Sequence, residues 1–250
     1  MSRSAVDPVL LDLRRRVRAL ERPGSAGRQA ALPFGIGAID AHLPAGGLAL
    51  GCLHEVVSGG RDRAQGALAA RFVAGILARL EGPVLWCLSC RDLFAPALAT
   101  VGLHPDRVLF AETGSDAAVL PAAEEGLRHA GLAGVVAEST RLGLTTGRRL
   151  QLAASRSGTT ALVLRRSRYD RDEPVIRPSA AVTRWRVSPL PSQAAPLPGL
   201  ARALWHLELT RCRNGVAASW IVEACDATGR LGLPPDLADR SAAPAGRAVA

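Results

Sequence analysis

The chain has 250 residues, 48% of them apolar, which is enough to form one large domain with a sizeable buried core. Its 31 basic and 22 acidic residues give a net charge of +9, and all 31 are arginines, because the sequence contains no lysine. Apolar runs of about eighteen residues are missing, and arginines follow the first apolar patch instead of preceding it, so we expect a cytoplasmic protein without membrane contact.

Residues 7–21 are expected to form an amphipathic helix that begins with Asp7 and Pro8 at the N-cap and first-turn positions. Its apolar stripe consists of Leu10, Leu13, Val17 and Leu20. A linker rich in Gly, Ser and Pro follows, so residues 1–30 are interpreted as an N-terminal arm. This arm either packs on the core of its own chain or binds a second copy or another partner.

From residue 50 onward, short apolar segments alternate with helical patterns. The strands are expected at residues 51–57, 83–89, 107–112, 134–139 and 159–165. The helices are expected around residues 64–80, 93–101, 116–130 and 147–156. Alternation of this kind with continuous apolar strands predicts an α/β fold, in which a mostly parallel sheet is covered by helices on both faces.

After residue 180 the pattern changes to strands in a hairpin-like series, with Asn214-Gly215 as a tight turn. These strands are expected to extend the sheet in antiparallel fashion at its C-terminal end. Residues 31–232 then form one domain, and residues 233–250, rich in Ala and Pro, are predicted to be a disordered tail.

The stretch from residue 53 to residue 80 has the layout of a phosphate-binding loop, with a strand, a glycine-containing turn and a helix. The segment before it, GIGAIDAHLPAGGLALGCLHEVV, resembles the lead-in to the nucleotide loop of RecA-like ATPases. Together with AAVTRWRVSPLPS, LELTRCRNG and WIVEACDATGRL near the C-terminus, the whole chain resembles the bacterial ImuA family, whose members are RecA-like and SulA-like. The resemblance implies a RecA-like domain.

The resemblance also implies a function and partners. Proteins of this family are accessory factors in damage-induced, error-prone translesion synthesis, alongside the polymerase-like protein ImuB and an error-prone replicative-type polymerase. RecA, single-stranded DNA and a second copy of the chain are further candidate partners. Two other functions stay open: a SulA-like inhibitor of cell division, and a RecA-like ATPase acting on DNA.

The nucleotide loop of this chain departs from the pattern G-x-x-x-x-G-K-[ST]. An ungapped match puts Ala64 at the lysine and Gln65 at the hydroxyl that binds Mg²⁺. No other register supplies a lysine, since the chain has none. We therefore predict a degenerate loop, no enzymatic activity and no cofactor or metal. The loop comprises Ser58, Gly59, Gly60, Arg61, Asp62, Arg63, Ala64 and Gln65.

Two further positions bear on catalysis. By resemblance, Cys90 occupies the place of the glutamate that activates water in RecA-like enzymes, and a thiol is a poor general base for this hydrolysis. Glu138 falls at the acidic strand end that holds the metal shell in those enzymes. Its alternative interpretation is a carboxylate that makes local hydrogen bonds at the end of the sheet.

An arginine-rich segment follows the last of the five apolar strands, and the net positive charge of the chain favours an anionic partner. Arginines beside an aromatic residue can follow a single strand of DNA, but acidic residues dilute the charge here. The segment is therefore either a DNA or partner surface or a solvated loop. Its residues are Arg165, Arg166, Arg168, Tyr169, Arg171 and Arg177.

Overall fold

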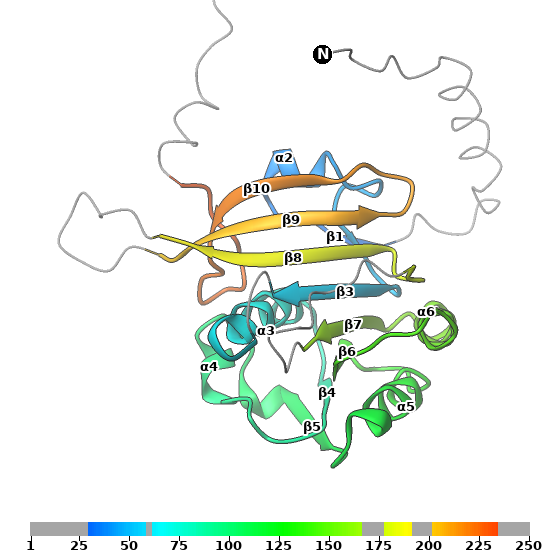
Figure 1. Ribbon diagram of the computed structural model, residues 1–250. Coiled ribbons are helices and arrows are strands. Elements are labelled where there is room, and N and C mark those ends of the chain that lie inside the picture. Colours follow the sequence, from blue (N-terminus) through cyan, green and yellow to red (C-terminus); the bar gives the residue numbers. More distant parts are fainter. Residues whose placement is uncertain (1–29, 59–61, 167–177, 192–201, 235–250) are drawn as a thin grey trace, which may run out of the picture.

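The computed structural model in Figure 1 describes four stretches of the chain, residues 30–58, 62–166, 178–191 and 202–234. Between residues 62 and 65 only the helical backbone is described. The predicted arm and nearly all of the predicted tail lie outside these stretches, so their structure stays a prediction. Within the described stretches, no helix is long and apolar enough to cross a membrane.

One eight-stranded sheet forms the centre of the described fold, with the strand order β10-β9-β8-β3-β7-β6-β4-β5. Five of these strands are parallel neighbours: β3 (Leu53–Ser58), β7 (Thr160–Arg165), β6 (Gly134–Ser139), β4 (Val84–Leu88) and β5 (Val108–Glu112). They match the five predicted strands with small shifts at their ends. The mostly parallel sheet predicted from the sequence is confirmed.

The parallel strands are mostly apolar because helices cover both faces of the sheet. In Figure 1, α3 (Asp62–Ala78) and α4 (Pro96–Ala99) lie on one side of the sheet, and α5 (Asp116–Gly126) and α6 (Leu144–Ser157) lie on the other. The strands β3 and β6 are accordingly buried at every position. The edge strand β5, in contrast, leaves Leu109 exposed.

The helix predicted over residues 93–101 is shorter in the structure, where only α4 is helical. Pro96 begins this helix, since proline suits the first turn, where its missing N–H is not needed. Gly102 follows its end with a φ of +84°, a conformation that other residues rarely adopt. The 3-10 helix η1 (Pro105–Arg107) then leads into β5.

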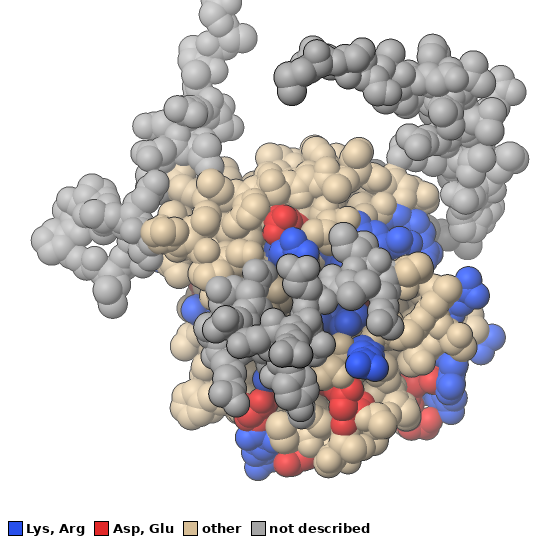
Figure 2. Space-filling view, in the orientation of Figure 1, with Lys and Arg blue, Asp and Glu red and all other residues tan. Residues whose placement is uncertain are grey.

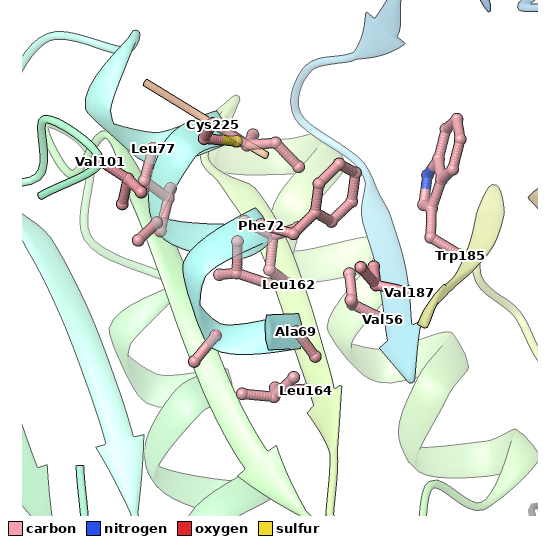
Figure 3. Close-up of a cluster of buried hydrophobic side chains, with 14 of the residues drawn as sticks. Val56, Ala69, Phe72, Leu77, Val101, Leu162, Leu164, Trp185, Val187 and Cys225 are labelled. Carbon is pink, nitrogen blue, oxygen red and sulfur yellow. The ribbon is translucent and has the colours of Figure 1, made fainter. Parts of the chain in front are cut away.

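The larger hydrophobic cluster lies between α3 and the sheet and is shown in Figure 3. Phe72 of α3 stands at its centre, with its ring centroid 5.9 Å from that of Trp185 and 6.0 Å from that of Phe34. All three rings are buried. Aromatic pairs at these separations add to the stabilisation from area burial, so this cluster holds α3 against the sheet and the segment before β3.

Before β3, the short strands β1 (Ala31–Leu32) and β2 (Leu48–Ala49) pair in antiparallel fashion around the helix α2 (Gly37–Asp40). The Asp40 carboxylate accepts hydrogen bonds from the backbone N–H groups of Phe34 at 2.7 Å and Gly35 at 2.9 Å. This fixes the turn that places Phe34 against Phe72.

The C-terminal strands extend the sheet, but the first of them runs differently from the prediction. β8 (Thr183–Leu190) is parallel to β3, whereas β9 (Leu204–Cys212) and β10 (Ala218–Glu223) continue in antiparallel fashion. The antiparallel extension is therefore confirmed from β9 onward. Asn214, with a φ of +61°, forms the predicted turn between β9 and β10, a conformation that asparagine tolerates better than most residues.

A buried hydrogen-bond network joins β3 to β8 on the α3 side. The Ala49 carbonyl can only accept, so His54 carries its proton on Nε2 and donates across 2.8 Å. Its Nδ1 then accepts from the Thr183 hydroxyl at 2.7 Å, and Thr183 Oγ1 accepts from Trp185 Nε1 at 2.8 Å. Burial lowers the pKa of His54 to about 4, so this histidine is neutral at pH 7.

After β10 the chain returns to α3 and completes the core. Cys225 is buried beside the middle of the helix, where Figure 3 shows it near Phe72 and Leu77. Gly75 of α3 makes this close approach possible, because a Cβ atom there would lie 2.5 Å from the Cys225 sulfur. Residues 224–231 therefore belong to the same core as the parallel strands.

Candidate functional site at the strand ends

The carboxyl ends of the parallel strands meet at one edge of the sheet, which is where open α/β sheets bind their ligands. Ser58 ends β3 there and is buried. Of the predicted degenerate loop, Gly59, Gly60 and Arg61 lie outside the described residues. The residues from Asp62 to Gln65 form the first turn of α3, and their side chains are not described. The structure therefore places the loop between a central strand and a helix, as the motif requires.

Glu138 lies at this edge, near the end of β6, and only 4% of its surface is exposed. One carboxylate oxygen accepts a hydrogen bond from Trp86 Nε1 at 2.7 Å, and the other accepts from the Arg166 guanidinium. Burial raises the pKa of Glu138 above its ordinary value and outweighs the opposing effects of Arg166 and the Trp86 indole. Both oxygens of this carboxylate thus have partners inside the protein.

Arg166 also reaches a second carboxylate, that of Asp92 in the loop after β4. Its two terminal nitrogens lie 3.3 Å and 2.8 Å from the two Asp92 oxygens, a bidentate arrangement that suits the planar guanidinium. The side chain of Arg166 is 18% exposed, and that of Asp92 is 48% exposed. One guanidinium therefore ties together the ends of β4, β6 and β7.

Cys90 lies close to this cluster, two residues before Asp92, and is exposed. Cys87, in the strand before it, is buried, and burial raises the pKa of its thiol to about 12. Within the described stretches, no group of three or more His, Cys, Asp and Glu residues could hold a metal ion. The interpretation of Cys90 as a vacant water-activating position stays a prediction.

Arg165, the residue before Arg166, points to the opposite face of the sheet, because successive residues of a strand alternate. It donates to the Thr140 carbonyl at 2.9 Å, and its Nη1 lies 3.7 Å from the carboxylate of Glu55 in β3. Glu55 is 1% exposed and also pairs with Arg184 of β8, at 3.2 Å. The Ser179 hydroxyl donates a further hydrogen bond to it.

These contacts change the interpretation of the arginine-rich segment. Arg165 and Arg166 were expected on one solvent-facing surface, but they lie on opposite faces of the sheet and are held by buried carboxylates. Their side chains are only 17% and 18% exposed. The rest of the predicted surface lies outside the described residues: Arg168, Tyr169, Arg171 and Arg177.

Sequence reasoning missed four residues of these clusters: Trp86, Asp92, Glu55 and Arg184. A signal was available for one of them, since Glu55 is a charged residue within a largely apolar strand pattern. Buried charges are paired, so such a residue indicates a buried ion pair, but Arg184 lies in a strand of alternating polar and apolar residues and was not marked as its partner. Trp86 and Asp92 gave no such signal.

The RecA-like resemblance implies a magnesium nucleotide at this edge, and the residues present do not fit it. The chain lacks the lysine that contacts the β- and γ-phosphates. The acidic strand end is closed as well, because the Glu138 oxygens accept from Trp86 and Arg166. A divalent cation there would lie against a guanidinium and meet electrostatic repulsion.

Comparison with solved structures identifies the fold class of this protein. A crystal structure of the RadB recombinase superposes with a TM-score of 0.53 and covers 81% of this chain and 99% of its own, at 18% sequence identity. This protein is therefore RecA-like in fold.

The particular family follows from sequence. Two proteins named Protein ImuA, from Caulobacter vibrioides strains NA1000 / CB15N and ATCC 19089 / CIP 103742 / CB 15, are each 38% identical over 205 residues. The match covers 78% of this chain and 84% of each relative. The chain belongs to the ImuA family. Models of known protein families were also compared, and none matches the chain.

Proposed function

We propose that this chain is a non-catalytic accessory protein of damage-induced, error-prone translesion DNA synthesis. Its membership of the ImuA family and its RecA-like fold support this proposal. The chain uses the RecA-like domain as a scaffold that assembles with a polymerase-like partner and an error-prone replicative-type polymerase in the cytoplasm.

One observation at the strand ends carries the non-catalytic part of the proposal. Arg166 neutralises the buried Glu138 from within the protein, at the place where an ATPase of this fold holds its metal shell. Phosphoryl transfer depends on cations that neutralise the developing charge, so a site without lysine and with an occupied acid lacks this stabilisation. Residues that bind a nucleotide in an enzyme here hold the protein itself together.

The experiment that tests this compares the chain with its Glu138→Gln variant in two assays. We expect ATP turnover at the background level for both proteins, and no rise in the melting temperature with Mg²⁺-ATP. The measurements are phosphate release and thermal unfolding with and without nucleotide. Steady turnover by the parent chain that Glu138→Gln abolishes would contradict the proposal and favour a RecA-like ATPase.

Assembly is tested by co-purification from cells after DNA damage. We expect the full chain to capture a polymerase-like protein, and deletion of residues 1–28 to reduce this capture or self-association while the core stays folded. Light scattering and circular dichroism check assembly and folding. If the shortened chain assembles normally, or if it precipitates, the arm is not a partner-binding element.

Direct contact with single-stranded DNA belongs to the same proposal, through the segment after Arg166. Because Arg165 and Arg166 are engaged inside the protein, the test uses Arg168, Arg171 and Arg177. Phosphate contacts give an affinity that falls steeply with salt, so changing the three together should flatten the salt dependence. Unchanged binding by that variant would make the segment a solvated loop.

A further inference from the structure

Helix α6 exposes two leucines outside its buried face. Its inner side is buried through Gly147, Leu150 and Ala154. On its outer side Leu144 is 39% exposed and Leu152 is 50% exposed. The two leucines are eight positions apart, so they lie about 12 Å apart along the helix and about 80° apart around its axis.

A groove runs along α6, between the helix and the chain segments beside it. Its volume is about 620 Å³. Its helix side is lined by Leu144, Arg148, Gln151, Leu152 and Ser155, and its other side by Ser179, Ala180 and Arg213. The Arg213 guanidinium is fixed in position, because its Nη2 donates to the Ala180 carbonyl at 2.7 Å. The groove therefore offers two leucines beside uncharged polar side chains, and it has an arginine on each side.

The described residues that line the groove carry charge of one sign, positive. Within the described part of the chain, no carboxylate lines the groove and none forms an ion pair with Arg148 or Arg213. The buried acid Glu55, which accepts a hydrogen bond from Ser179, pairs with Arg165 and Arg184. Two arginines thus line the groove, and no carboxylate among the described residues faces them.

We infer that this groove binds an acidic amphipathic helix of a partner protein, with apolar residues two turns apart on Leu144 and Leu152 and carboxylates opposite Arg148 and Arg213. Charge complementarity selects an acidic segment, and it disfavours the chain's own arm, in which arginines lie between the leucines. The exposed leucines select a protein helix over DNA, because nucleic-acid surfaces are far more polar and charged. The inference deepens the proposed accessory function by giving one docking surface and its partner's chemistry.

The test uses the full chain and a fluorescein-labelled helical peptide with leucines two turns apart and glutamates beside them. Fluorescence anisotropy should show saturable binding, and a matched peptide with lysines in place of the glutamates should not bind. Arg148→Glu and Leu152→Ser should each weaken binding about tenfold or more, as central contacts of an interface do.

Two matched controls separate the groove from general surface effects. Arg156→Glu changes an exposed arginine of the same helix outside the groove, and Leu109→Ser changes an exposed leucine on β5. Both should stay within about twofold of the parent chain, since neither residue belongs to the interface. Equal binding of the glutamate and lysine peptides, no saturable binding, or insensitivity to Arg148→Glu overturns the inference.

Competition with single-stranded DNA covers the remaining alternative. The groove would be a nucleic-acid surface if an oligonucleotide bound with high affinity to the parent chain but not to Arg148→Glu, and if the peptide did not bind. That result overturns the inference. A failure of this docking inference can be distinguished from a failure of the proposed accessory function. If the parent chain and its Arg148→Glu variant capture the polymerase-like partner equally well, the accessory role stands and the groove has no part in it.

Discussion

Glu55 and Glu138 are both buried carboxylates on parallel strands, yet their arginine partners are arranged in opposite ways. Glu55 lies in the middle of the sheet and has two guanidiniums near it, those of Arg165 and Arg184. Glu138 lies at the strand ends and shares a single guanidinium, that of Arg166, with a second acid. The first cluster has an excess of positive charge, and the second has an excess of negative charge.

The difference shows what each cluster does. Glu55 pairs with Arg184 of β8, so its charge joins the C-terminal extension to the central strand. Glu138 joins only the ends of parallel strands, at the edge where ligands bind in this fold. The mid-sheet cluster thus joins two parts of the sheet, whereas the strand-end cluster places an internal ion pair at the edge where this fold binds ligands.

Removing the Glu55 carboxylate should cause the largest loss of stability. We expect Glu55→Ala to lower the free energy of unfolding by about 3–5 kcal/mol, because two nearly buried guanidiniums lose their counter-charge. Urea denaturation measures this change. The matched control is Glu208→Ala on β9, whose carboxylate lies 3.8 Å from Arg186 and is 26% exposed, and its loss should stay below about 1 kcal/mol. Equal losses for both variants would show that Glu55 has no special role.

Lowering the pH should also weaken the contact between β3 and β8, through His54 on the other face of the sheet. The folded pKa of about 4 lies below the ordinary 6.5, so the unfolded chain binds the proton first as the pH falls. This contribution is complete above pH 6.5 and decreases toward pH 4, where about 3 kcal/mol is lost. Urea denaturation at several pH values should show this slope in the parent chain. A slope that persists unchanged in His54→Gln would assign it to other groups.

The strand-end cluster should tolerate the loss of its arginine better. We expect Arg166→Met to destabilise by about 2 kcal/mol, because Glu138 keeps its bond from Trp86 and, with its raised pKa, can take up a proton. The double variant Arg166→Met with Glu138→Gln should recover part of this loss. A double-mutant cycle in urea measures the coupling. A coupling near zero would mean that the two side chains act independently.

Much of the fold was predictable because its signals are local. The strands from β3 to β7 and the helices between them follow from apolar runs and helical spacing, and Asn214-Gly215 marked a turn correctly. The direction of β8 was not predictable in this way. It depends on pairing with β3, more than 100 residues earlier, through contacts such as Glu55 with Arg184.

The candidate site was predictable only as a set of positions. The sequence showed that Glu138 ends a buried strand and that no lysine is present, but it gave no information on which cation faces that acid. Arg165 and Arg166 were interpreted as one surface because they are adjacent in sequence. Adjacency on a strand places side chains on opposite faces, and the assignment of each arginine to its acid depends on the sheet order.

The smallest loss of stability is expected at Asp92, the exposed acid of the strand-end cluster, and this loss should depend on the salt concentration. Asp92 is 48% exposed, so Asp92→Asn should change the free energy of unfolding by about 0.5 kcal/mol at low ionic strength. The screening length falls from about 10 Å at 0.1 M salt to about 3 Å at 1 M, close to the separation of this exposed pair, so the difference should shrink at high salt. The loss in Glu55→Ala should persist in salt, since its partners are nearly buried. Matched urea titrations at low and high salt test both statements, and a salt-sensitive Glu55 with a salt-insensitive Asp92 would reverse the contrast between the two clusters.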